Sequence, residues 1–475
     1  MKKIIIIIPI LAFLTGCNSL DDVEPIYTLD DDKAIFDEAS AQIVLNGVYN
    51  ELRDGERATF ITGASLANSM MGLSNNGGLS GNPLVANNPQ INAEEIEGLY
   101  LGAYRIIQEA NLFIERVEVL EANAFGNDAI KNNFLAEGRF LRGLAHFYLL
   151  RSFGQFYDTS SLYGISLKLE PSYNATPTSR NSVSESYAAI YADLDFAIEN
   201  CFLSESYYAN KDAAKAIKAK VLLYEGEYEK AASLAKEIID TTSRTFTDNY
   251  SDNFGKNFPA HESSALFFGP FFNTNEAVNR AFSSGGTLGT IYESIARPNP
   301  NNSSTWDPRA GQELFPGVSV PFNKGTTIDF TKFPTIVFTL PTHIHMRLAE
   351  IYLIHAEAAA RIGVDVDLEA LASLNEVRTR PAVDLPPLLI GVDVSSKAEL
   401  LEAIRIEKLL ELYFENGEDF FDLIRYDING NIDPSTVKPT MNNVDKYIFP
   451  IPWIELQVQG SEDIIIQNPG YPITL

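Results

Sequence analysis

Residues 210–240 read NKDAAKAIKAKVLLYEGEYEKAASLAKEIID, two amphipathic segments that are interrupted once, at Gly226. The spacing Gly226-x-Tyr228-x-x-Ala231 is typical of a helical hairpin. Glycine permits the tight turn, and alanine lets the second helix approach the first closely. Because one hairpin cannot bury its own apolar face, we expect further helices to stack against it.

Helical periodicity of the apolar residues extends through most of the chain. This pattern predicts a mainly α fold of about four tetratricopeptide-like helix pairs. The expected helices lie at about 34–54, 96–154, 183–240 and 342–427. Residues 55–95 and 244–341 lack the periodicity and are rich in Gly, Asn and Pro or in short apolar runs. Loops of this length within a compact protein are commonly functional or disordered, and the aromatic residues throughout 244–341 argue against disorder there.

The amino terminus has the pattern of a bacterial lipoprotein leader. A basic start precedes an apolar run at residues 4–16, which is too short to cross a bilayer as a helix. Leu14-Thr15-Gly16-Cys17 has the form of a lipobox, in which the cysteine is acylated and becomes the first mature residue. We therefore expect a signal peptide at 1–16, acylated Cys17 with a flexible acidic tether at 17–33, and a single domain at 34–475.

Composition limits the compartment and the partners. The chain has 36 Lys and Arg against 63 Asp and Glu, a net charge of −27, so we expect no binding to nucleic acid. With Cys17 acylated, Cys201 is the remaining cysteine. This count excludes a disulfide framework and a cysteine zinc site, and we interpret Cys201 as a buried structural thiol.

Several local motifs together span nearly the whole chain. The longest are AEGRFLRGLAHFY at 136–148 and RLAEIYLIHAEA at 347–358, and FFDLIR follows at 420–425. Shorter ones are LNGVY at 45–49, Tyr104-x-x-Ile107-x-x-Ala110-Asn111, Leu374-Asn375-x-Val377-Arg378, Pro450-Ile451-Pro452 and QNPGY at 467–471. In combination they resemble the SusD/RagB family of nutrient-binding outer-membrane lipoproteins. One turn departs from the family pattern, because Asn416 is interposed and Glu418 and Asp419 precede Phe420. The departure bears on ion pairing there and not on the fold.

The resemblance implies a SusD-like fold, in which the helix pairs pack against an irregular, loop-rich ligand-binding side formed by residues 55–95 and 244–341. It also implies a lipid-anchored, surface-exposed location at the cell outer membrane. Asp21 and Asp22, soon after Cys17, resemble the surface-export signal of such lipoproteins. The resemblance also implies that the protein has a partner, a SusC-like TonB-dependent outer-membrane transporter. We predict a protein that captures a glycan nutrient and delivers it to that transporter. Two alternatives stay open: a peptide-binding uptake lipoprotein of the RagB type, and a helical scaffold that binds only protein.

Candidate ligand-binding residues lie in the two long non-helical segments. Sugars bind through aromatic faces, with polar side chains hydrogen-bonding at the rim. Trp306 lies in the polar stretch NNSSTWDPRA and is the first candidate, the alternative being a loop anchor packed beneath the surface. Tyr292 is the second aromatic candidate. Candidate polar contacts, each also explicable as turn chemistry, are Asn75, Asn76, Asn82, Asp307 and Arg309.

Paired carboxylates raise the question of catalysis. Glu350 and Glu357 share a helix face, as do Glu407 and Glu411, and glycosidases use two carboxylates across the scissile bond. Arginines stand nearby at 347, 361, 378 and 405, so we interpret these acids as structural ion pairs and expect no enzymatic activity. The histidines lack zinc-ligand spacing, and residues 427–433 fit an Asn/Gly turn better than a calcium loop. We therefore expect no metal and no cofactor.

Overall fold

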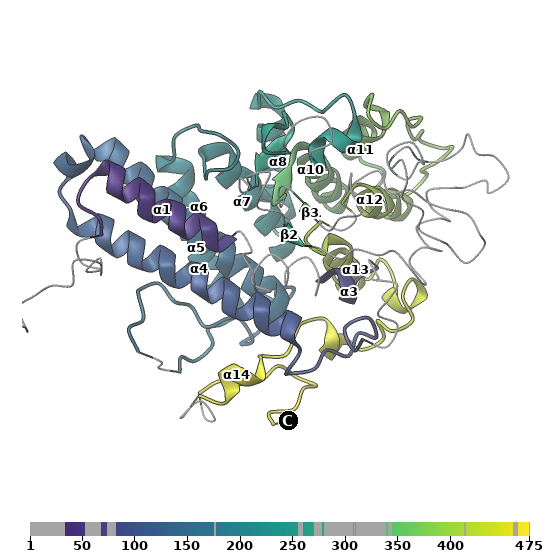
Figure 1. Ribbon diagram of the computed structural model, residues 1–475. Helices are drawn as coiled ribbons and strands as arrows, with labels where there is room; N and C mark the ends of the chain where they lie inside the picture. Colours follow the sequence, from purple (N-terminus) through teal and green to yellow (C-terminus); the bar gives the residue numbers. More distant parts are fainter. Residues whose placement is uncertain are drawn as a thin grey trace, which may run out of the picture.

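The computed structural model describes residues 34–52, 68–73, 82–174, 177–254, 260–269, 278–279, 307, 309, 339–340, 344–412, 415–458 and 464–474. Over these ranges the chain is mainly α-helical, and the predicted fold class is confirmed (Figure 1). The α-helices are α1 (Glu38–Leu52), α3 (Asn68–Met71), α4 (Glu94–Val119), α5 (Asp128–Phe153), α6 (Val183–Asn200), α7 (Lys211–Glu225), α8 (Tyr228–Thr241), α10 (Leu348–Ile362), α11 (Leu368–Thr379), α12 (Lys397–Leu412), α13 (Glu418–Ile428) and α14 (Trp453–Leu456). Short 3-10 helices are η3 (Ala122–Phe125), η4 (Tyr250–Phe254), η5 (Ala260–Glu262), η9 (Pro434–Thr436) and η10 (Val444–Lys446).

The long helices pack mainly against their neighbours in sequence. Contacts link α4 to α5, α5 to α6, α6 to α7 and α7 to α8, and then α8 to α10 and α10 to α11 and α12. In Figure 1, α1, α4 and α5 run side by side in one half of the molecule, and α10, α11, α12 and α13 gather in the other. This serial stacking is the arrangement expected of helical hairpins that share a continuous core.

The predicted hairpin at residues 210–240 is formed by α7 and α8. Gly226 ends α7 in the left-handed region, with φ of 89°, and its N–H donates to the carbonyls of Leu222 and Leu223. That geometry satisfies carbonyls at the helix end and strains any residue with a side chain. Ala231 is fully buried on α8, so its small side chain permits close packing of the two helices. The local sequence signal therefore corresponds to the observed turn.

Helix α5 is enclosed on all sides over most of its length. It contacts α1, α4, α6 and α7, and nearly every side chain from residue 134 to 153 is buried. Asn127 caps its start by accepting a hydrogen bond from the Ile130 N–H at 3.0 Å. A Cβ at Gly143 would lie 3.0 Å from the Cβ of Asp193 on α6, so the two helices meet closely there. The apolar and small residues of the motif at 136–148 thus build the centre of the core.

Extended structure among the described residues is short and lies between the helical halves. Strand β1 (Leu266–Phe268) pairs antiparallel with β4 (Met346–Arg347), and β2 (Val278–Asn279) pairs antiparallel with β3 (Thr339–Leu340). The β1–β4 pair ties the chain after α8 to the residues that directly precede α10. None of the helices in the described part of the chain is long and apolar enough to span a bilayer.

Candidate functional site

The turn that joins α12 to α13 contacts residues 68–73, which belong to the first long non-helical segment, 55–95. Gly417 has φ of 70°, and a Cβ built on it would lie 2.3 Å from the Cβ of Asn68 in α3. A Cβ at Gly72 would lie 2.6 Å from Oδ2 of Asp419. A side chain at Gly417 would therefore prevent α3 from packing directly on this turn, and one at Gly72 would displace the Asp419 carboxylate. The Leu73 N–H donates to Asp419 Oδ2 at 2.5 Å and fixes the contact.

Lys438 fastens the same segment from the C-terminal side. Its Nζ donates to the carbonyls of Met71 at 2.8 Å and Gly72 at 2.7 Å, which the end of α3 leaves without helical partners. Burial lowers the pKa of Lys438 to about 7, against the opposing effect of Asp419. Asn87 also donates to the Met71 carbonyl, at 2.7 Å. Residues 68–73 are thus held by several buried polar contacts.

Arg309 fastens the second long segment to α12. Its guanidinium is fully buried and lies 2.7 Å from Asp307, 2.6 Å from Glu407 and 2.8 Å from Glu411. Arg309 Nε also donates to Asp307 Oδ1 at 3.0 Å. Burial would raise the pKa of Glu411, but Arg380, Arg347 and Arg309 outweigh it and hold that pKa well below its ordinary value. Buried charges of this kind are tolerated only when they are paired.

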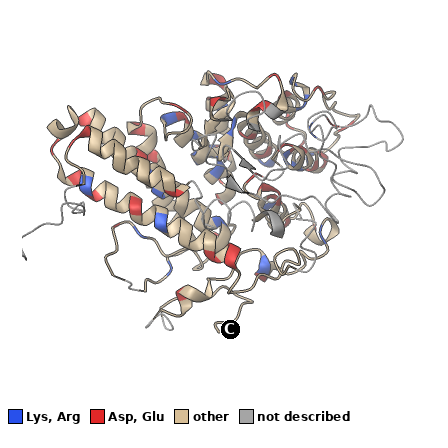
Figure 2. Ribbon diagram, viewed as in Figure 1, with Lys and Arg blue, Asp and Glu red and all other residues tan. Residues whose placement is uncertain are grey.

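Residues 344–347, which directly precede α10, contact the same turn between α12 and α13. Arg347, at the end of β4, donates to both carboxylate oxygens of Glu415, at 2.9 and 2.8 Å, and also pairs with Glu411. Asn416 Nδ2 donates to the Ile344 carbonyl at 2.9 Å. Basic and acidic positions are accordingly interspersed among the helices of this half (Figure 2). Segments 68–73, 307–309 and 344–347 therefore all attach to α12 or to its turn into α13.

Ion pairing at the turn is preserved despite the departure of its sequence from the family pattern. Glu418 lies 2.8 Å from Arg151 of α5 and 3.2 Å from Lys220 of α7. Burial alone would raise the pKa of Glu418, but Lys220 and Arg151 bring it down to about 2. Lys220 also lies 2.6 Å from Glu350, whose pKa burial raises to about 7. Arg151 and Lys220 lie on helices far from Glu418 in the sequence, so no local motif predicts these ion pairs.

The predicted ligand-binding residues fall into three groups in the structure. Asp307 and Arg309 are 3% and 1% exposed and pair with each other, so they anchor the chain, and a direct contact of either with ligand stays a prediction. Asn82 is partly exposed and accepts a hydrogen bond from the Leu84 N–H at 2.8 Å, which is turn chemistry. Residues outside the described part of the chain are Asn75, Asn76, Tyr292 and Trp306, as well as Cys17.

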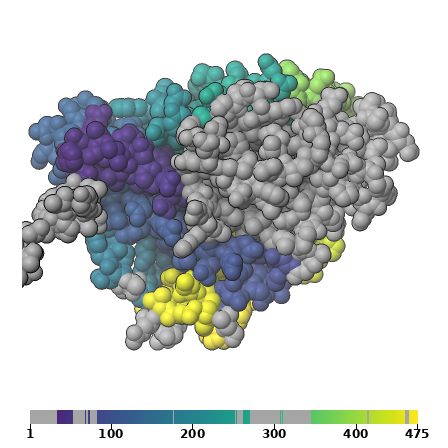
Figure 3. Space-filling model, in the orientation of Figure 1, coloured from purple at the N-terminus to yellow at the C-terminus, as the bar shows by residue number. Residues whose placement is uncertain are grey.

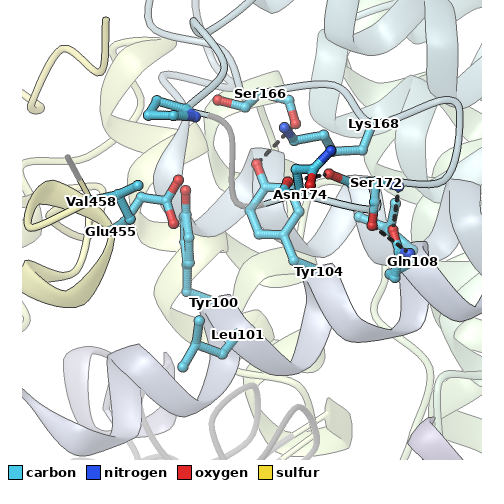
Figure 4. Close-up of a pocket in the computed structure, with 12 residues that line it drawn as sticks. Tyr100, Leu101, Tyr104, Gln108, Ser166, Lys168, Ser172, Asn174, Glu455 and Val458 are labelled. Carbon is cyan, nitrogen blue, oxygen red and sulfur yellow. Dashed lines mark hydrogen bonds between the residues drawn. The ribbon is translucent and has the colours of Figure 1, made fainter. Parts of the chain in front are cut away.

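A cavity of about 220 Å³ lies elsewhere, between α4, the segment 166–177 and α14 (Figure 4). Tyr100 and Tyr104 line it from α4, with ring centroids 4.8 Å apart. Glu455 enters from α14, and its carboxylate lies beside the hydroxyl end of Tyr100 in Figure 4. The backbone N–H of Trp453 donates to the Ile91 carbonyl at 2.7 Å, which holds α14 near the start of α4. In Figure 3 the yellow C-terminal residues accordingly lie against blue residues from the first third of the chain.

Sequence reasoning missed this cavity. The two tyrosines stand four residues apart in a predicted helix, a spacing that places side chains on one face. That signal was available but is equally typical of a core stripe. Nothing local connects these tyrosines to Glu455, which lies near the other end of the chain.

Comparison with known families gives matches along much of the chain. The model described as the SusD family matches residues 335–471, and the model described as starch-binding associating with outer membrane matches residues 21–223. A third model, the prokaryotic membrane lipoprotein lipid attachment site, matches residues 1–18. Because the last range contains Cys17 in its lipobox, the match agrees with the anchor expected from the sequence.

Similar proteins and structures extend over nearly the whole chain. SusD-like protein P2 of Formosa agariphila is 24% identical over 99% of this chain and 100% of its own length, and SusD-like protein P38 of the same organism is 24% identical over 87% and 89%. A SusD superfamily structure from Bacteroides vulgatus superposes with a TM-score of 0.73 at 16% identity, covering 92% of this chain and 99% of that one. A laminarin-binding SusD-like protein superposes with a TM-score of 0.67 at 22% identity, covering 92% and 100%. At these identities the structural likeness shows the fold.

The helical architecture, the two SusD-type matches and the lipid attachment site point to one family and one location. The lipid anchor predicted from the leader and the outer-membrane location implied by the resemblance are confirmed by the lipid-attachment match and by the outer-membrane family description. The chain belongs to the SusD/RagB family of outer-membrane lipoproteins.

Proposed function

We propose that this protein captures a glycan at the cell surface and passes it to a SusC-like TonB-dependent transporter. The family it belongs to includes a branch described as starch-binding, and one structural relative is described as laminarin-binding. A lipid anchor keeps the domain at the membrane where such a transporter would lie. The proposed role is that of a binding protein and not of an enzyme.

The observation that carries the proposal is the attachment of both candidate ligand-binding segments to one helix and its turn. Asn75 and Asn76 follow Leu73 closely in sequence, and Leu73 is hydrogen-bonded to Asp419. Trp306 directly precedes Asp307, which Arg309 ties to α12. A rigid support beneath a loop residue lowers the entropy lost when that residue contacts ligand. We therefore assign Trp306 and the two asparagines to one ligand-binding surface, with Tyr292 and Asn82 as further members.

The chemistry of these residues fits a sugar chain. An indole face stacks on the apolar face of a pyranose ring, and each asparagine amide offers both donors and an acceptor to hydroxyl groups. The carboxylates on the supporting helix are not free for catalysis, because Glu407 and Glu411 are saturated by arginines. The supports hold Leu73 and Asp307, which lie close in sequence to the candidate ligand-binding residues.

Calorimetry against a panel of oligosaccharides, including starch- and laminarin-derived chains, tests the proposal. The purified mature lipoprotein would be used in a detergent without a sugar headgroup. We expect at least one glycan to bind, and Trp306→Ala to weaken its affinity at least tenfold, since truncating an aromatic anchor costs about 2 kcal/mol or more. Phe36→Ala is the matched control, because Phe36 is 65% exposed and lies just before α1.

The alternatives appear as distinct outcomes. Binding of peptides with no binding of any glycan would move the protein to peptide uptake, and binding of neither would leave a protein-binding scaffold. Delivery is tested separately by isolating the lipoprotein from solubilised outer membranes through an affinity tag. A TonB-dependent transporter should be recovered in fixed stoichiometry with it; its absence at low and high ionic strength would refute delivery to such a partner.

A further inference from the structure

The cavity between α4 and α14 is built from parts of the chain that the α12–α13 turn does not hold. Its walls come from α4, from residues 166–177 and from residues 455–458, and none of these residues belongs to segments 68–73, 307–309 or 344–347. At about 220 Å³ it holds the volume of about seven waters at ~30 Å³ each. Sites for larger ligands are commonly ~300 Å³ or more, so this cavity fits one small ring and not a chain.

The walls are fixed before any ligand arrives. Tyr104 donates its hydroxyl hydrogen to the Ser166 carbonyl at 2.9 Å. Gln108 makes two hydrogen bonds to the backbone of Ser172, one to its carbonyl at 3.0 Å and one from its N–H at 2.8 Å. These bonds hold residues 166–172 against α4. A preformed cavity avoids the ordering cost that weakens binding by mobile loops.

The lining combines apolar walls with groups that bind hydroxyls. The apolar walls come from both tyrosine rings and from Leu101, Ile107, Pro177 and Val458. Within the described part of the chain, no hydrogen bond reaches the Glu455 carboxylate, which is half-buried and faces the cavity beside Tyr100 (Figure 4). Lys168 enters from the other side with its ammonium group directed to the Thr178 hydroxyl. Leu101 is 37% exposed, so the mouth opens to solvent.

The Glu455 carboxylate and the Lys168 ammonium group interact electrostatically in this small, largely apolar cavity, and no hydrogen bond among the described residues occupies the carboxylate. Such a pair calls for a neutral ligand with many hydroxyls. An anion would meet Glu455, and a cation would meet Lys168. A pyranose ring suits both, since its hydroxyls donate to a carboxylate and accept from an ammonium group while its C–H face lies on tyrosine. We propose that this cavity is a second sugar site that holds a single pyranose unit, an inference that rests on the proposed glycan-binding function.

A titration with single sugar rings tests the second site independently of the first. The probes are the methyl α- and β-pyranosides of glucose, galactose, mannose and xylose, observed by saturation-transfer NMR on the mature lipoprotein in sugar-free detergent. At least one probe should bind in the millimolar range. Glu455→Gln should weaken it about tenfold, because it removes a charged acceptor with little change of shape. Leu101→Trp should block the mouth and abolish binding without lowering the thermal midpoint.

Controls separate this inference from the proposed function. Glu94→Gln makes the same charge change at an exposed position of α4 and should alter affinity less than twofold. Trp306→Ala should leave binding of the single ring intact while it weakens binding of long glycans. Absence of binding by all the pyranosides, full binding by Glu455→Gln, or loss of ring binding in Trp306→Ala would each overturn the second site. None of these results would touch long-glycan capture that depends on Trp306.

Discussion

Replacing Arg309 by methionine tests whether the ion pairs on α12 hold the ligand-binding segment in place. The change removes a fully buried guanidinium that contacts three carboxylates. Glu411 keeps Arg347 and Arg380, and Glu407 keeps Arg378. Among the described residues only Asp307 is left without a cation.

The expected loss in the free energy of unfolding depends on how many carboxylates the change leaves without a cation. Breaking a buried ion pair costs about 3–5 kcal/mol, mainly through the charge left behind. With one carboxylate stranded instead of three, we expect Arg309→Met to lower the free energy of unfolding by about 3 kcal/mol. The double variant Asp307→Asn, Arg309→Met should recover more than half of the loss, because it strands no charge. Arg105→Met is the control, since Arg105 is 54% exposed and lies 3.6 Å from Glu51. Its expected cost is ~0–1 kcal/mol.

Urea unfolding at pH 7, followed by far-ultraviolet circular dichroism, measures all three variants. Their urea dependence should match that of the wild type, so that a shifted midpoint reports stability. If Arg309→Met costs no more than Arg105→Met, the network does not stabilise the attachment of this segment. If the double variant is as unstable as the single one, stranded charge is the wrong explanation. Glycan affinity of Arg309→Met, measured where the protein is still folded, should fall together with stability.

Three further changes give expected outcomes. Burial raises the pKa of Glu137 to about 7, so ionising it costs stability as pH rises from about 4.5 toward 7. Glu137→Gln should therefore raise the free energy of unfolding at pH 8 by up to roughly 3 kcal/mol and leave it nearly unchanged at pH 4. Thermal unfolding at both pH values measures this, and an equal gain at both would contradict it. Gly417→Ala should destabilise more than Gly226→Ala in calorimetry, because both have positive φ but only Gly417 has a Cβ position 2.3 Å from Asn68; equal midpoints would mean that α3 does not rest on the turn. Cys17→Ala should abolish labelling by radioactive palmitate and release the protein from the membrane, and labelling that persists would show a different anchor.

Local sequence patterns predicted the helices well because each pattern has a local cause. The break at Gly226 predicted the turn between α7 and α8, since a left-handed residue at a helix end favours glycine whatever surrounds it. Apolar periodicity marked α4, α5 and α10 because each must bury one face or more. The interpretation of the paired carboxylates as structural ion pairs is also confirmed, as in the contact of Arg361 with Glu357.

The partners in most of those pairs were not predictable from the sequence. The expected i, i+3 or i+4 pairing fails for Glu407, because Arg405 forms its i, i+3 pair with Glu402. Glu407 instead pairs with Arg309 and Arg378, which lie far from it in the chain. A helical pattern specifies which residues share a face, whereas long-range partners depend on how the helices are docked.

By itself, the sequence determined the helical architecture, the leader with its lipobox and the family, since these rest on neighbouring residues and short motifs. Only the tertiary structure decided that Asp307 and Arg309 are buried supports, and that Glu455 faces Tyr100 across one cavity. The physical reason is the same in both cases. The sequence around a charged side chain does not show whether that side chain contacts water, a ligand or a buried partner. The packing of segments that are distant in sequence determines which of these it contacts.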